Sequence, residues 1–174
     1  MPETVTCIRP YRTSDAVAVG RLIARTYERF NLGFATPEER AALLGPFRGA
    51  QSDDPSDLAA IAEAISAPLV LVAAEGGSIV GVLRGGRVDR RGRAVLQSLF
   101  VDGPHHRRGI GRRLVERFEQ SCRDRGIDAI RVASTLYAVP FYEALGYRRS
   151  TGRRTLRSFD GSRLPYQPMR KQLG

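Results

Sequence analysis

The spacing of apolar residues in the first third of the chain predicts helices. After residue 15, apolar residues recur every three or four positions, which is typical of an amphipathic helix capped by Ser14 or Asp15. Its apolar stripe consists of Val19, Leu22, Ile23, Tyr27 and Phe30. Two shorter helices follow, one opened by the capping box Thr36-Pro37-Glu38-Glu39 and one by Asp54-Pro55.

After residue 68 the pattern changes to short apolar runs, which predict strands. Residues 69–74 and 78–88 form a predicted hairpin, and the run 93–101 is apolar on both faces, as expected of a strand covered on both sides. The remaining predicted elements are a strand at 5–9, a helix after 109, a strand at 127–133, a short helix at 138–145, and a closing hairpin of 153–159 and 166–171 around Asp160-Gly161-Ser162. Antiparallel strands with one helix crossing between the fourth and fifth predict an α+β (mixed α/β) fold, with residues 1–174 as a single domain.

The junction between the strand at 93–101 and the helix after it carries the clearest chemical pattern. Gly109 and Gly111 lack side chains, so an anionic group could closely approach the backbone N–H groups at the helix start. Arginines at 107, 108, 112 and 113 add positive charge. The pattern predicts a phosphate or pyrophosphate site, with a tight turn beside a solvated arginine face as the alternative. The Gly-Lys-Ser/Thr of a P-loop is missing.

A second motif lies downstream of this junction. The segment Ala138–Tyr147 follows the triplet Gly109-Ile110-Gly111, and the two together resemble the GNAT superfamily of N-acetyltransferases. The triplet is similar to the family's acetyl-CoA pyrophosphate loop, although His106 stands where Gln or Arg is usual. The downstream segment resembles the family pattern Ala-x-x-Phe-Tyr-x-x-Leu-Gly-Phe/Tyr, with Thr135 where Asn is common.

This resemblance implies the GNAT fold, a mostly antiparallel central sheet with splayed fourth and fifth strands and helices on both faces. It also implies acetyl-CoA as co-substrate, lying in the cleft between the splayed strands. Main-chain groups of Leu99, Phe100 and Val101 would face the pantetheine. The implied cofactor-binding residues are these three with His106, Arg107, Arg108, Gly109, Ile110, Gly111, Arg112 and Thr135.

The resemblance places Tyr142 at the family's general-acid position, where a phenol could protonate the departing thiolate. The alternative is that Tyr142 belongs to the apolar face of a short helix. No base is evident, because the positions where relatives often carry a carboxylate are Gln97 and Ser98. Acidic residues in the helical region fit caps or solvated positions better; these are Glu28, Glu38, Glu39, Asp53 and Asp54. His105 and His106 are expected too close to the phosphate loop to act as base.

Composition narrows the cellular setting. The formal net charge is +10, and Lys171 is the only lysine among 28 basic residues. Two cysteines, Cys7 and Cys122, do not make a disulfide framework, so a cytoplasmic location is expected. The sequence shows no apolar run of the ~20 residues that span a membrane, and no signal-peptide pattern at Met1–Thr4. No metal site is expected.

The predicted function is therefore transfer of an acetyl group from acetyl-CoA to a primary amine, by direct attack in a ternary complex. A non-catalytic acyl-CoA-binding or regulatory domain of the same fold is the alternative. Nucleic-acid binding through the arginines is a third class, which no recognition motif supports. The acceptor is open between a small amine, an antibiotic, an amino acid and a protein N-terminus. Residues 31–54, with Phe34 and Phe47, are expected on its side of the site, and a homodimer is left open.

Overall fold

One mixed sheet of eight strands forms the centre of the protein. The computed structural model describes residues 5–30, 35–157 and 163–174. The strand order is β1-β2-β3-β4-β5-β8-β6, with β7 paired to β8. The strands are β1 (Cys7–Pro10), β2 (Leu69–Glu75), β3 (Ser78–Val88), β4 (Ala94–Val101), β5 (Ala129–Thr135), β6 (Arg148–Arg149), β7 (Arg154–Arg157) and β8 (Arg163–Gln172).

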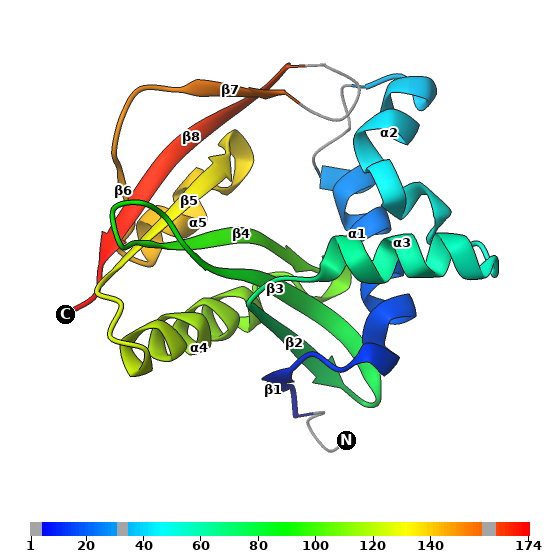
Figure 1. Cartoon of the computed structure of the whole chain (residues 1–174), viewed down its shortest axis with the longest axis horizontal. Helices are drawn as coiled ribbons and strands as arrows, with labels where there is room; N and C mark the ends of the chain where they lie inside the picture. Colours follow the sequence, from blue (N-terminus) through cyan, green and yellow to red (C-terminus); the bar gives the residue numbers. More distant parts are fainter. Residues whose placement is uncertain (1–4, 31–34, 158–162) are drawn as a thin grey trace.

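Helices cover both faces of this sheet, as predicted. They are α1 (Ala16–Phe30), α2 (Pro37–Leu44), α3 (Pro55–Ile65), α4 (Ile110–Asp124) and α5 (Val139–Ala144). In β3, Val82 joins a core cluster with α1, α2 and α3, whereas its neighbour Leu83 joins a second cluster with α4 and α5. Because successive residues of a strand face opposite sides, the two clusters lie on opposite faces of the sheet. Figure 1 shows α1, α2 and α3 gathered at one end and α4 below the strands.

Local sequence signals account for most of these boundaries. The Thr36 side chain accepts a hydrogen bond from the Glu39 backbone N–H, and the Glu39 carboxylate accepts one from the Thr36 backbone N–H, so the predicted capping box is present. Asp54 caps α3. Gly76 and Gly77 both have positive φ, at 55° and 82°, as a tight hairpin between β2 and β3 requires.

The start of α1 differs from the prediction that Ser14 or Asp15 caps it. Residues 13–15 form a 3-10 turn before the helix. The Asp15 carboxylate accepts the backbone N–H of Arg12 at 2.8 Å and pairs with Arg9 at 2.7 Å. Its charge partner is 6 positions back in the chain, so Asp15 ties β1 to this turn instead of capping α1.

The sheet opens between β4 and β5. These parallel strands pair only at Ala94–Leu96 with Ile130–Val132. Beyond that point β4 stays with β3 and β5 stays with β8, so the strands diverge, as Figure 1 shows. The expected cover on both faces of β4 therefore holds only for its first three residues, and residues 97–101 are partly or fully exposed.

The C-terminal part of the sheet holds one strand that the pattern missed, since β6 spans only Arg148–Arg149 and pairs with β8. β7 and β8 pair as the predicted hairpin arms, and the predicted turn Asp160-Gly161-Ser162 lies outside the described residues. Across the described ranges, no helix has both the length and the apolar character that crossing a membrane demands.

Candidate active site

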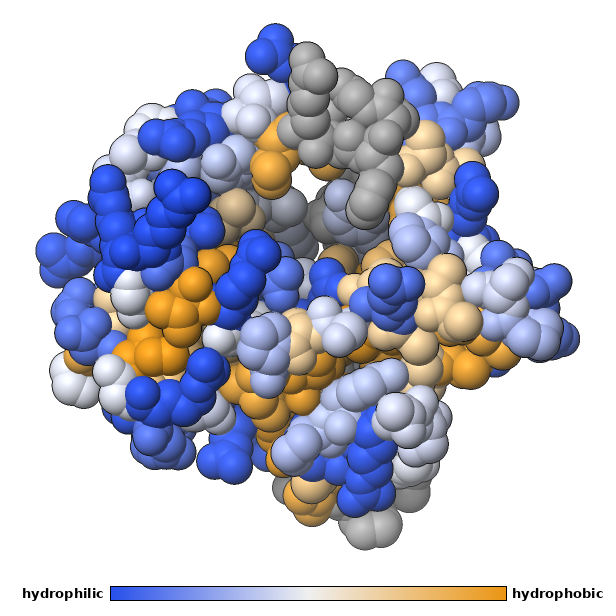
Figure 2. Space-filling view, viewed as in Figure 1, coloured by the Kyte–Doolittle hydropathy of each residue, from blue (hydrophilic) through white to orange (hydrophobic). Residues whose placement is uncertain are grey.

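A cavity of about 830 Å³ lies where β4 and β5 part. Its walls come from segments far apart in sequence: β4 and β5, the loop before α4, α5, and on the opposite side α1, α2 and residue Phe47. Figure 2 shows this face of the molecule hollowed between the β5–β8 side and the helical side. Because β4 has left β5 here, its main chain can pair with an extended ligand.

The loop between β4 and α4 has the backbone geometry of an anion site. Gly109 precedes α4 in the left-handed region at φ 75°, and Arg107 is the one described non-glycine residue with positive φ, at 61°. Left-handed residues next to a helix start turn several N–H groups toward one point, which favours a negative ligand. His106 Nε2 lies 2.7 Å from the Val101 carbonyl oxygen and donates to it, so His106 ties the loop to β4.

The four arginines in this loop and in the first turn of α4 have different partners. Arg107 and Arg112 line the cavity. Arg108 instead forms a two-bond ion pair with Glu75, at 3.0 and 3.1 Å, and Arg113 donates to the Thr6 carbonyl at 2.8 Å. Arg108, predicted to bind the cofactor, does not line the cavity, because its guanidinium is held by Glu75.

Packing gives a second reason for glycine at position 111, beside the close approach of an anion expected from the sequence. A Cβ at this position would lie 3.2 Å from Cε2 and Cζ of Phe141 and 3.7 Å from Cγ2 of Val101. The side-chain direction therefore points at α5 and β4, and the missing side chain lets α4 pack closely against Phe141. Gly109, in contrast, has open space around it and is required by its positive φ.

The remaining predicted cofactor residues also lie on this cavity. Leu99, Phe100 and Val101 line it from β4, Ile110 lines it from α4, and Thr135 lines it at the end of β5. The Phe100 ring meets Tyr27 of α1 edge to face, with 6.1 Å between ring centroids. The β4 wall is thus fixed from the helical side of the molecule.

Tyr142 lies on the opposite wall, in α5. Its side chain is buried and makes edge-to-face contacts with Phe141 and Tyr147, at centroid distances of 5.1 and 5.4 Å. Burial raises the pKa of Tyr142 above its ordinary value, so the phenol keeps its proton at neutral pH. The residue is both a core residue and a cavity residue, so the two readings from the sequence are not exclusive.

Comparison with known proteins identifies the family. The family model described as an acetyltransferase (GNAT) domain matches residues 50–173, which is more than two thirds of the chain. The chain belongs to the GNAT acetyltransferase family. Among curated proteins, none matches the sequence significantly.

Solved structures of GNAT proteins share the fold. A GCN5-related N-acetyltransferase from Rhodopseudomonas palustris has 22% identity and a TM-score of 0.73, with 99% of each chain covered. The ribosomal-protein-S18-alanine N-acetyltransferase from Escherichia coli has 20% identity and a TM-score of 0.63, covering 98% of this chain and 95% of that one. PaiA N-acetyltransferase from Thermoplasma acidophilum, solved with coenzyme A, has 16% identity and a TM-score of 0.63, covering 97% and 99%. The predicted GNAT fold is confirmed.

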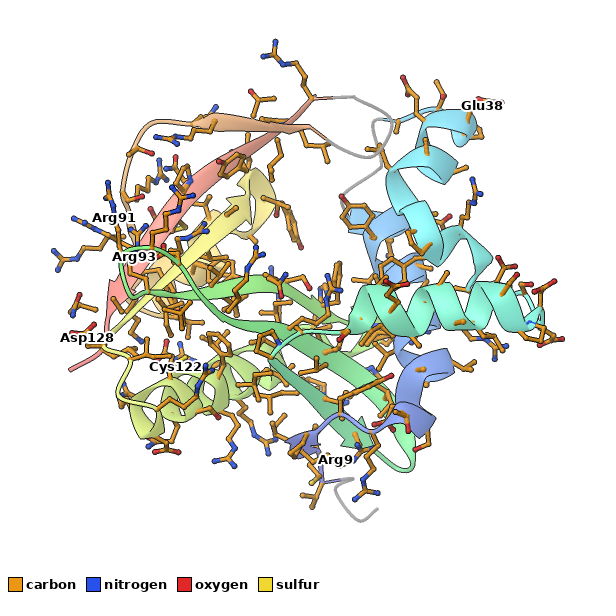
Figure 3. The ribbon with its side chains drawn as sticks, in the orientation of Figure 1. Arg9, Glu38, Arg91, Arg93, Cys122 and Asp128 are labelled. Atoms are coloured by element: carbon orange, nitrogen blue, oxygen red, sulfur yellow. The ribbon has the colours of Figure 1, made fainter. Side chains whose placement is uncertain are left out.

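Within this GNAT domain, the acidic residues considered as base lie away from the cavity. Glu39 and Asp54 serve as helix caps, and Glu28, Glu38 and Asp53 are exposed. Figure 3 shows Glu38 at the outer end of α2. In the described parts of the chain, no Asp or Glu lines the cavity at all. Phe47 does line it, as expected, whereas Phe34 lies outside the described residues.

Sequence reasoning missed several polar residues of the cavity, among them one arginine and one threonine. Arg84 in β3 and Thr26 in α1 both line it, on the helical side. A signal for Arg84 was present, because it is the only charged residue in the otherwise apolar stretch 79–86. Thr26 carried no such signal, since a threonine on a helix is ordinary.

Proposed function

We propose that this GNAT protein transfers the acetyl group of acetyl-CoA to a primary amine, which attacks the thioester directly in a ternary complex. One observation carries the proposal: the same cavity joins the basic loop before α4, the gap between β4 and β5, and the wall made by α1 and α2. A long, partly anionic donor and a second substrate can therefore meet in it. The related PaiA structure with coenzyme A supports a CoA ligand.

The loop and β4 would hold the donor. Backbone N–H groups of residues 109–111, with the side chains of Arg107 and Arg112, would bind the pyrophosphate. Main-chain groups of Leu99, Phe100 and Val101 would pair with the pantetheine, and Thr135 would contact it from β5. His106 keeps the loop against β4 through the Val101 carbonyl, which is a positioning role.

Tyr142 would supply the proton for the departing thiolate. Its hydroxyl makes no hydrogen bond to a described residue, and its raised pKa keeps it a donor over the whole neutral range. As the C–S bond breaks, the O–H can donate to the sulfur and spread the developing charge. The buried ring contacts with Phe141 and Tyr147 fix its direction.

The amine would enter in its neutral form. The described cavity wall carries Arg84, Arg107 and Arg112 but no carboxylate, and positive charge disfavours an ammonium ion, which lowers its pKa. The wall thereby raises the fraction of free amine without an acidic base. The proton that the nitrogen loses after attack can pass to water at the open side of the cavity, and water returns a proton to the Tyr142 phenolate, so that the acid is restored and no net proton is released.

Binding and turnover test the proposal separately. Calorimetry with acetyl-CoA should show saturable binding, and a broad panel of amines should include acceptors that accelerate thiol release, with acetylated product seen by mass spectrometry. Undetectable binding at millimolar acetyl-CoA would refute the donor. Tight binding with no accelerated release for any amine would favour the non-catalytic acyl-CoA-binding alternative.

We also propose a cytoplasmic location. Both cysteines are free thiols, with Cys7 exposed and Cys122 buried, which fits a reducing compartment. Localisation of a fluorescent fusion in the source cell would test it.

A further inference from the structure

Arg84 is a charged residue where the fold places almost only apolar ones. It lies in β3 opposite Ser98 of β4, and its half-buried guanidinium lines the cavity. Nε donates to Ser98 Oγ at 2.9 Å and Nη1 donates to the carbonyl of Ala64 near the end of α3. Both acceptors are neutral, so they fix the direction of the guanidinium without balancing its charge.

No carboxylate among the described residues pairs with Arg84. Other partly buried arginines do have such partners: Arg9 pairs with Asp15, and Arg93 and Arg131 both pair with Asp89. A cation removed from water without an anion is costly, and burial lowers the pKa of Arg84 from its ordinary value. The cost is recovered if a ligand brings the anion.

The position of Arg84 assigns this anion to the acceptor and not to CoA. Val101, next to the phosphate loop, pairs with Gly81, whereas Arg84 pairs with Ser98. Three residues of strand separate the two positions, about 10 Å. Arg84 pairs with Ser98, but the next residue of β3, Gly85, pairs with Leu96 of β4. Gln97 therefore has no partner in β3 and forms a β-bulge in β4. Arg84 therefore stands at the bulge, at the end of the cavity away from the loop.

The surroundings of Arg84 fit a small ligand with one anionic and one apolar group. Tyr27, Leu43, Leu44 and Phe47 supply an apolar wall on this side. Thr26 Oγ1 is buried there and has no hydrogen-bond partner among the described residues, so it can donate to a ligand oxygen. Acceptors with several positive charges, such as polyamines and aminoglycosides, fit poorly because they would meet Arg84 and no described carboxylate.

We propose that Arg84 binds the carboxylate of the acceptor, and that the acceptor is a small amine of the amino-acid class with an apolar side chain. This inference rests on the proposed acetyl transfer and names its substrate. The guanidinium, held by Ser98 and Ala64, presents its remaining N–H groups to the carboxylate, while the side chain lies against Tyr27 and Phe47. The amine is then directed toward β4, where the thioester would lie.

Matched acceptors test the proposal on the unmodified protein. Apolar amino acids, their carboxamides and their decarboxylated amines are compared by kcat/KM for thiol release. A charged hydrogen-bonded pair in a partly dry site leads us to expect the free acid to be better by roughly 30-fold or more. The amine of an amino-acid amide is less basic than that of the free acid, so more of it is neutral and ready to react. This difference favours the amide, so a preference for the free acid must come from binding of the carboxylate. Equal or better turnover of amides, decarboxylated amines or polyamines would overturn the proposal.

Variants separate carboxylate binding from a purely structural role. Arg84→Gln should raise KM for the acid by roughly 30-fold with little effect on the amide, and Arg84→Lys should restore part of the preference. Arg87→Gln, an exposed arginine of the same strand, is the matched control. If Arg84 only caps α3, Arg84→Gln lowers the melting temperature while the acid-to-amide ratio stays unchanged. If Arg84→Gln does not fold, Arg84→Lys and the matched acceptors still decide.

Direct binding distinguishes failure of this inference from failure of the proposed function. Calorimetry with apolar amino acids in the presence of CoA should show binding that their amides lack and that Arg84→Gln abolishes. If this binding occurs without any turnover, acetyl transfer fails and the carboxylate site stands. If turnover occurs but is indifferent to the carboxylate, acetyl transfer stands and the Arg84 site fails.

Discussion

At the scale of single residues, Tyr142 is a packed core residue for which we propose a role as general acid. Replacing Tyr142 by Phe keeps the ring and its contacts with Phe141 and Tyr147 and removes only the hydroxyl. We expect kcat to fall by about 10²–10⁴ because a general acid is lost, while the dissociation constant of acetyl-CoA changes little. Steady-state kinetics and calorimetry measure both quantities.

Tyr147→Phe is the matched control for this change. Tyr147 is buried and does not line the cavity, so the loss of its hydroxyl should leave kcat unchanged. If Tyr142→Phe instead retains more than about half the kcat where chemistry limits the rate, its hydroxyl is not the acid. Tyr142 would then act through packing alone.

Gly111 supports a different prediction, about stability. Gly111→Val would push a branched side chain into the Phe141 ring, which already lies 3.2 Å from the Cβ position. Overpacking of this kind costs about 1–3 kcal/mol, and it should displace α5, which carries Tyr142. Thermal unfolding should show a lower melting temperature, and kcat should fall as well. Gly152→Val, where nothing lies within 4 Å of the Cβ position, is the control and should unfold like the wild type.

At the scale of elements, the turn between β3 and β4 fixes the closed end of the splayed sheet. Asp89 Oδ1 accepts the backbone N–H groups of Arg91 and Arg93, and Oδ2 accepts Arg93 Nε at 3.0 Å and Arg131 Nε at 2.8 Å. Arg131 lies in β5, opposite Val95 of β4. One carboxylate thus joins the β3–β4 turn to β5, beside the short stretch where β4 and β5 pair in parallel. Figure 3 shows Arg91 and Arg93 in this turn.

This arrangement predicts a pH-dependent effect of Asp89→Asn. Burial raises the pKa of Asp89, but the hydrogen bonds from Arg93 and from the backbone outweigh it and lower the pKa well below the ordinary value. A carboxylate with a depressed native pKa stabilises the fold above its unfolded pKa of about 3.9, and loses this effect as pH falls toward the native pKa. The variant should lose about 1–2 kcal/mol at pH 7, with a difference that shrinks below about pH 4.

Urea unfolding at about pH 7, 5 and 3.5 measures the difference in unfolding free energy between the wild type and the variant. These pH values lie on both sides of the ordinary carboxylate pKa. Asp128→Asn is the control, because Asp128 is exposed just before β5 and no ion pair of its side chain is found in the described structure. An equal loss of unfolding free energy in both variants, or a loss that does not change with pH, would show that the charge on Asp89 does not stabilise the contact between the β3–β4 turn and β5.

The same scale shows what the sequence could and could not predict. The helix starts at Thr36 and Asp54 could be predicted because each capping motif spans only a few residues. The two family motifs located the loop before α4 and the helix α5. Signals that are local in the sequence were therefore enough to place most elements. The partners of Arg108 and Arg84 could not be predicted, because Glu75 and Ala64 lie 33 and 20 positions away and reach them only through the sheet and its helices. The β4 bulge at Gln97 depends on register with β3, which no local pattern records.

At the scale of the whole molecule, charge is distributed so that the cavity is positive. The chain carries a net charge of +10, and in the described residues the carboxylates lie elsewhere, in helix caps and in ion pairs such as those of Glu75 and Asp89. Such a surface attracts an anionic donor and repels ammonium ions, more strongly at low salt. It also implies that proton removal from the acceptor does not depend on an acidic group of the described cavity wall.

The pH profile of turnover follows from this distribution. If the amine reacts from its neutral form, log kcat/KM for the acceptor should rise with a slope of about 1 and level off near the amine's own pKa. Tyr142 should cause no falling limb below about pH 10, because burial raises its pKa and it stays protonated. Measuring acceptors whose amines differ in pKa should move the plateau by the same interval. A break that is common to all acceptors, whatever their amine pKa, would instead assign proton removal to a group of the enzyme, and the positive cavity would then serve only to bind the two substrates.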